Sequence, residues 1–132
     1  MTVAAALAAH PSPAAQQDLL AAAVAAALGC SQACTACADS CLSESDVTDM
    51  RRCISTDLTC ADVCAMTARV LSRQTSPDAD VVRAVLVACI AACTTCGEEC
   101  AAHADHHEHC RVCAQACQEC AQACRALLDV LA

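Results

Sequence analysis

Apolar and small residues recur at steps of three and four along most of this 132-residue chain, with polar residues between them. Such steps keep one face of an α-helix apolar. Proline and short polar segments interrupt the pattern at few places, and alanine, a strong helix former, dominates the rest. The pattern predicts four long helices over residues 13–42, 46–74, 77–103 and 106–131, preceded by an arm or short helix over residues 1–11.

Each predicted helix begins at a start signal. Ser12–Pro13 offers an N-cap followed by proline at the first helical position. Asp46 and Ser76–Asp78 supply capping oxygens to the second and third helices, and Asp105–Glu108 has the spacing of a capping box. Because the connections are short, we expect an all-α fold over residues 12–132, an antiparallel up-down-up-down four-helix bundle.

Cysteine occupies the positions that face the core in such a bundle. The 16 cysteines fall into four stripes, one on each predicted helix, and each stripe keeps a single helical phase. The stripes are Cys30, Cys34, Cys37 and Cys41; Cys53, Cys60 and Cys64; Cys89, Cys93, Cys96 and Cys100; and Cys110, Cys113, Cys117, Cys120 and Cys124. We therefore expect a cysteine-lined core, in which Asp57 fills the position that a complete row of thiols would give to cysteine.

Composition and charge narrow the possible roles. The chain has no aromatic residue, so its hydrophobic core is thin, and we expect metal binding or oligomerisation to complete it. The net charge of -8 argues against partners such as nucleic acid and acidic membrane surfaces. No apolar run reaches transmembrane length and no secretory signal is evident, so we expect a cytoplasmic protein whose cysteines stay reduced.

Sulfur stripes of this length suit Cu(I) better than Zn(II) or an iron–sulfur cluster. Cu(I) is soft and accepts two or three thiolates, so one stripe becomes a chain of sites. A thiol that releases a proton as it takes up one Cu(I) leaves the interior neutral, whereas four thiolates around one Zn(II) leave a double negative charge. At one ion per thiolate plus a few more, we expect roughly 16 to 20 Cu(I) per chain.

The two ends of the predicted bundle differ in chemistry. One end is filled by aliphatic residues that continue the stripes: Leu19, Leu20, Leu71, Val82, Leu86, Leu127, Leu128 and Leu131. The other end gathers residues that can bind a soft cation: Cys41, Met50, His103, His106, His107 and His109. We expect this second end, the mouth, to admit metal, with Met50, Asp57 and the four histidines as candidate ligands beside the cysteines.

Other interpretations remain open at the level of sequence. Cysteine can be a small buried apolar residue or form disulfides, Asp57 can pair with an arginine or water, and the histidines can belong to a solvated loop. Asp62, Glu98, Glu99 and Glu119 are expected on solvated faces. The chain could also be a zinc or general soft-metal buffer, or a thiol–disulfide redox protein that uses Cys34–Cys37 or Cys93–Cys96, although both pairs lie in mid-helix rather than at a helix N-terminus.

The four cysteine stripes and the histidine-rich turn over residues 103–109 resemble the cytosolic four-helix-bundle copper storage proteins of bacteria. The resemblance covers nearly the whole chain from Ser12. It implies a non-catalytic Cu(I) store that assembles as a homotetramer and exchanges copper with small thiols or a copper chaperone. The gap at Asp57 departs from a complete thiol row.

Overall fold

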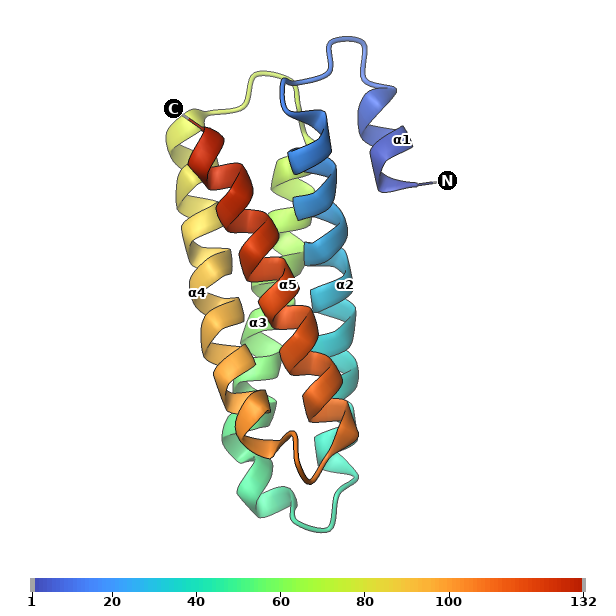
Figure 1. Ribbon diagram of the computed structural model, residues 1–132, viewed down its shortest axis with the longest axis vertical. Coiled ribbons are helices and arrows are strands. Elements are labelled where there is room, and N and C mark those ends of the chain that lie inside the picture. The colour runs from blue at the N-terminus through green and yellow to red at the C-terminus, as the bar shows by residue number, and fades with distance from the viewer. Residues whose placement is uncertain (1, 132) are drawn as a thin grey trace.

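The computed structural model describes residues 2–131, and its main body is a bundle of four long helices (Figure 1). In chain order the elements are α1 (Val3–Ala8), α2 (Gln17–Leu42), the short 3-10 helix η1 (Val47–Met50), α3 (Arg51–Ser72), α4 (Ala79–His103) and α5 (Glu108–Val130). Neighbouring long helices run in opposite directions (Figure 1). The predicted all-α antiparallel four-helix bundle is confirmed.

The long helices form a closed ring of neighbours. Helix α2 packs against α3 and α5, and α4 packs against the same two helices. Helices α2 and α4 therefore lie diagonally opposite each other, as do α3 and α5. By length and composition alone, α2 and α4 are apolar enough to cross a membrane. In this fold their cysteine stripes are buried inside the bundle.

The start of α2 differs from the sequence prediction. The predicted start at Pro13 is wrong, because α2 begins at Gln17 and Gln16 adopts a left-handed conformation with φ of 62°. Gln74, two residues after the end of α3, accounts for the difference. Its Oε1 accepts hydrogen bonds from the backbone N–H of Ala14 at 2.8 Å and from Nε2 of Gln17 at 2.7 Å. These bonds hold the segment before Gln17 in a loop.

The other long helices also begin a few residues after their predicted starts. Helix α4 begins after Asp78, whose carboxylate accepts a hydrogen bond from the N–H of Val81 at 3.0 Å. The predicted capping box at Asp105–Glu108 does not form, because His107 is the N-cap and Glu108 pairs with Arg111. Asp46 precedes η1 without capping it through its side chain. Its carboxylate contacts His107 instead.

The two ends of the bundle have the chemistry that the sequence predicted. At the end where α2 begins, Leu20, Leu71, Leu86 and Leu127 are buried. Helix α1 packs on α2 and buries Leu7, whose carbonyl accepts a hydrogen bond from Nε2 of Gln74 at 2.9 Å. The opposite end carries the two connections between α2 and η1 and between α4 and α5 (Figure 1). This second end is the mouth.

Candidate metal centre

All 16 cysteine side chains lie inside the bundle. Each is at most 1% exposed, and each is a free thiol. Their helical phase explains this arrangement, because steps of three and four keep the sulfur atoms of one helix on the face that meets the other three. The prediction of inward-facing stripes is confirmed, and the disulfide interpretation is contradicted. The sixteen side chains are called the thiol core below.

The sulfur atoms of the thiol core form a nearly continuous chain along the bundle axis. Neighbouring Sγ atoms lie 3.5 to 4.0 Å apart, with the shortest separation between Cys64 and Cys93. One path of such contacts runs through Cys53, Cys100, Cys96, Cys34, Cys30, Cys60, Cys64, Cys89 and Cys124. Each step on this path is 3.7 to 3.9 Å.

These separations match the spacing of sulfur atoms around a shared metal ion. An ion about 2.3 Å from each thiolate places the sulfur atoms roughly 3.8 to 4.0 Å apart in tetrahedral or trigonal geometry. Several sets of four donor atoms lie within 4.8 Å of one another, including Cys34, Cys96, Cys113 and Cys117. Cys34 also belongs to a second set, with Cys30, Cys60 and Cys117. Shared thiols of this kind suit clusters with bridging sulfur rather than isolated ions.

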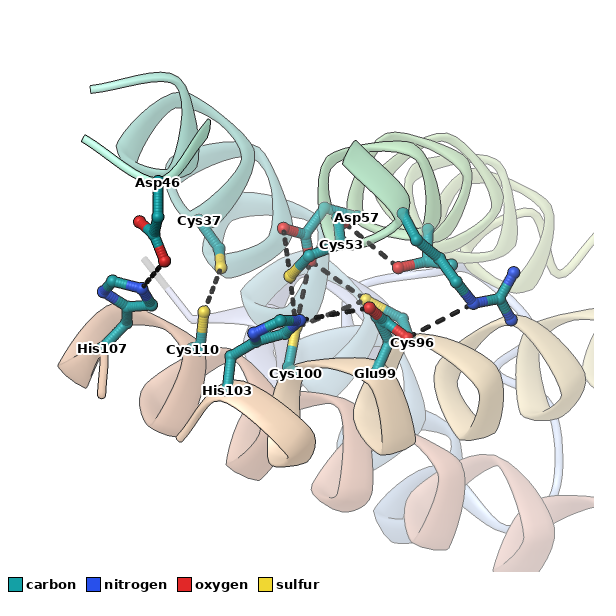
Figure 2. A network of polar contacts seen from close by, with 12 residues as sticks. Cys37, Asp46, Cys53, Asp57, Cys96, Glu99, Cys100, His103, His107 and Cys110 are labelled. Atoms are coloured by element: carbon teal, nitrogen blue, oxygen red, sulfur yellow. Dashed lines mark hydrogen bonds and ion pairs between the residues drawn. The ribbon is translucent and has the colours of Figure 1, made fainter. Parts of the chain in front are cut away.

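Asp57 lies within the thiol core at the position where the row on α3 lacks a cysteine. Its Oδ1 accepts hydrogen bonds from the thiols of Cys96 and Cys100 at 3.0 and 3.3 Å (Figure 2). It also accepts one from the thiol of Cys113 at 3.2 Å. Burial, together with hydrogen bonding between the carboxyl group and Cys96, raises the pKa of Asp57 to about 12. The carboxyl group is therefore protonated at neutral pH and pairs with thiols, not with arginine.

His109 and Cys37 connect the mouth to the thiol core. Nδ1 of His109 lies 3.4 Å from Sγ of Cys37 and 3.6 Å from Sγ of Cys110. Hydrogen bonding with Cys100, with a contribution from His109, lowers the pKa of Cys37 to about 6. Burial lowers the pKa of His109, but Cys37 and Glu44 outweigh it and the net shift is upward. The lowered pKa of Cys37 favours its thiolate form, beside Nδ1 of His109 at the entrance.

Two other thiols at this end have raised pKa values, in contrast to Cys37. Burial raises the pKa of Cys41 and of Cys110. Together with Cys37 and His109 these two cysteines make one of the sets of four close donors. This set joins the solvent side of the mouth to the buried sulfur chain, and one of its thiols is already ionised.

The remaining predicted ligands lie at the mouth in different settings. Met50 is fully buried at the end of η1. Nε2 of His103 lies 3.2 Å from Oε1 of Glu99, and Nε2 of His107 lies 3.1 Å from Oδ2 of Asp46 (Figure 2). Nδ1 of His107 contacts Glu44. His106 is exposed.

Sequence reasoning missed the carboxylates that surround these histidines. Glu99 was expected on a solvated face, but its side chain is only 18% exposed and also pairs with Arg52 at 3.3 Å. Asp46 was expected only as a helix cap, and no contact was predicted for Glu44. Glu99 stands four residues before His103 on the same helix, a spacing that could have indicated their contact. Glu44 and Asp46 reach His107 across a turn and leave no periodic signal.

Comparison with known proteins points to the same family that the cysteine stripes resemble. A sequence model of the copper storage protein family matches residues 16–129. A curated relative from Bacillus subtilis, the uncharacterized cysteine-rich protein YhjQ, is 37% identical over 91 residues, which is 69% of this chain and 79% of that protein.

Two solved structures from Streptomyces lividans are similar throughout. The copper storage protein Ccsp loaded with 10 copper equivalents is 54% identical, with a TM-score of 0.94 over 97% of this chain and 98% of that chain. A cytosolic copper storage protein with five coppers is 58% identical, with a TM-score of 0.86 over 87% of this chain and 96% of that chain. The chain belongs to the copper storage protein family.

Proposed function

We propose that this protein is a non-catalytic, high-capacity store of Cu(I), held by thiolates inside the four-helix bundle. The observation that carries the proposal is the nearly continuous series of sulfur contacts of 3.5 to 4.0 Å along the bundle axis. The proposed ligands are the 16 cysteines of the thiol core, with His109, Met50 and Asp57 near the mouth. His103 and His107 are proposed to contact copper as it enters.

Charge balance supports Cu(I) as the cargo. Each thiol that releases a proton and binds one monovalent ion adds no net charge to the interior. Among the described residues the buried polar side chains are Asp57, Thr67 and Gln74, so the core offers little to stabilise extra negative charge. Repeated Zn(II) sites with four thiolates each would carry a double negative charge apiece. A full load is proposed at roughly 16 to 20 Cu(I) per chain.

The proposed location is the cytosol, where copper arrives by thiolate exchange. The similar protein from Streptomyces lividans is described as cytosolic. Small thiols or a copper chaperone are the proposed donors and acceptors, because a ligand that offers sulfur can pass Cu(I) to Cys37 without releasing it to water. The thiol–disulfide alternative is disfavoured, because Cys34 and Cys93 are buried in mid-helix, away from the helix N-termini that activate redox cysteines.

The proposed assembly is a homotetramer built through the outer faces of α2 and α4. The solvent-facing side of α2 carries Ala25 and Leu28, and that of α4 carries Val81, Ala84 and Val87. These faces belong to two helices that each pack against α3 and α5. Two different apolar faces that each pair with their own copy close into a tetramer where the two two-fold axes cross at right angles.

Anaerobic titration of the reduced protein with Cu(I), in the presence of a competing chelator, tests the storage proposal. The expected result is tight uptake of well over ten ions per chain before the chelator begins to fill. A plateau at one to four ions would contradict the proposal. Competition with Zn(II) in the same assay separates a copper store from a general soft-metal buffer. A copper store should release bound Zn(II) when Cu(I) is added, whereas a general buffer would keep it.

A further inference from the structure

A second group of metal-binding side chains lies outside the thiol core, on the solvent side of the mouth. Oε2 of Glu44 contacts Nδ1 of His107 and lies 3.4 Å from Nε2 of His109. Nε2 of His107 lies 3.1 Å from Oδ2 of Asp46 (Figure 2). The two imidazole rings stack with their centroids 5.4 Å apart. These four residues are called the mouth cluster.

The side chains of the mouth cluster are partly enclosed and come from two separate segments. Glu44 and Asp46 lie between α2 and η1, whereas His107 and His109 stand at the start of α5. The side chain of His107 is 12% exposed and that of His109 is 24% exposed. Because the four donors converge from both sides of the entrance, one ion placed among them would tie the two segments together.

The donor atoms of the mouth cluster differ in kind from those of the thiol core. Imidazole nitrogen and carboxylate oxygen favour divalent ions of borderline hardness, whereas thiolate favours Cu(I). An imidazole binds a metal ion through an unprotonated nitrogen, so the two carboxylates set the charge of the bound site at two negative charges, which a divalent cation neutralises and a monovalent cation does not.

We propose that Glu44, His107 and His109, supported by Asp46, bind one divalent transition metal ion such as Zn(II) or Cu(II) at the mouth. This site is separate from the Cu(I) sites. His109 can serve both, because its Nδ1 faces Cys37 and its Nε2 faces Glu44. Asp46 holds His107 from the far side of the ring through the second nitrogen. The protein then stores a soft ion inside and carries a borderline ion at its entrance.

Zinc titration of the fully Cu(I)-loaded protein under anaerobic conditions tests this site, because the thiolates are then already occupied. Isothermal titration and metal analysis after dialysis are expected to show one Zn(II) per chain with the copper count unchanged. His107→Ala and Glu44→Gln are each expected to weaken zinc binding by at least about tenfold. His106→Ala, an exposed histidine on the same turn, is the matched control and should bind zinc as the native chain does.

Three results would overturn the proposal. The loaded native protein could take up no zinc, which would leave the mouth cluster as a set of ion pairs only. Zinc could displace copper from the thiol core instead of adding to it. His106→Ala could weaken binding as much as His107→Ala. Copper capacity is measured first on every variant, so a variant that fails to fold is recognised and Glu44→Gln then carries the test.

Discussion

Asp57 shows how one buried side chain takes its chemistry from its neighbours. Among the described residues it is the only fully buried carboxylic acid, and thiol donors surround its Oδ1. Removal from water makes the ionised carboxylate costly, so the native state holds the proton. The unfolded chain loses that proton at the ordinary pKa of about 3.8. The stability of the metal-free protein is therefore linked to pH through this residue.

The linkage predicts that Asp57 stabilises the metal-free fold less as pH rises. A raised native pKa gives its full stabilisation below pH 3.8 and loses it progressively up to about pH 12. Relative to Asp57→Asn, which does not titrate, the native chain should lose up to about 1.4 kcal/mol of unfolding free energy per pH unit. Urea denaturation of the reduced, metal-free proteins between pH 5 and 7 measures this difference. A difference that stays constant with pH would contradict the protonated state.

His109 is expected to control the first step of copper loading. Its Nδ1 is the imidazole donor beside the thiolate of Cys37 and the thiol of Cys110. His109→Ala should slow Cu(I) uptake, or weaken the first ion bound, by at least about tenfold while changing total capacity by no more than one or two ions. Stopped-flow transfer from a Cu(I) chelator complex measures this rate. His106→Ala is the control, and equal rates for both variants would exclude this role for His109.

At the residue level, the sequence was sufficient to place the thiols and insufficient to place the carboxylates around the histidines. The cysteines share one helical phase over many turns, and a bundle can bury only that face. Glu44 has no such constraint. Its contact with His107 depends on how two turns from separate parts of the chain pack together, and no residue spacing in the sequence indicates that contact.

The helices form where the pattern predicts, but they begin a few residues later than predicted. Ser12–Pro13 has a strong local start signal, yet Gln74 binds the following segment and α2 starts at Gln17. Hydrogen bonds made by a residue far along the chain outweigh a local preference worth about 1 kcal/mol. Asp78 caps α4 as its local signal predicts, through the N–H of Val81.

Two helical glycines allow the packing of α4 against α5 to be measured. A Cβ atom on Gly97 would lie 3.2 Å from Cβ of Cys117, whereas one on Gly29 would meet no atom within 4 Å. Gly29→Ala should stabilise the protein by about 1 kcal/mol through helix propensity. Gly97→Ala should gain clearly less or destabilise, because α4 and α5 must move apart. Urea denaturation of the metal-free proteins checks this, and equal gains would contradict the close approach.

On the scale of the whole molecule, the ring of helices separates polar from apolar outer faces. Helix α5 exposes arginine, glutamine and glutamate along its outer side, including Arg111, Gln115 and Glu119. Helix α4, diagonally opposite α2, exposes mainly valine and alanine between Val81 and Ala91. The thin core and the apolar faces both favour an oligomer. A chain without aromatic residues buries little apolar surface within one subunit, so further apolar surface is buried between subunits.

Charge placed on the apolar faces should therefore divide the proposed tetramer. Leu28→Glu on α2 and Val87→Glu on α4 are each expected to give dimers, and the double variant monomers. Val112→Glu on α5, a residue of similar exposure at 47% against 48% for Leu28 and 56% for Val87, should leave the assembly intact. Light scattering after size exclusion measures the masses. Dissociation by Val112→Glu alone would place the interface on another face.

The metal content of the protein purified from copper-fed cells tests the central claim most directly. If the thiol core stores Cu(I), elemental analysis should find more than ten copper atoms per chain and at most one zinc, the latter removable by His107→Ala. Four or fewer copper atoms, or zinc in excess of copper, would contradict storage of Cu(I) along the sulfur chain.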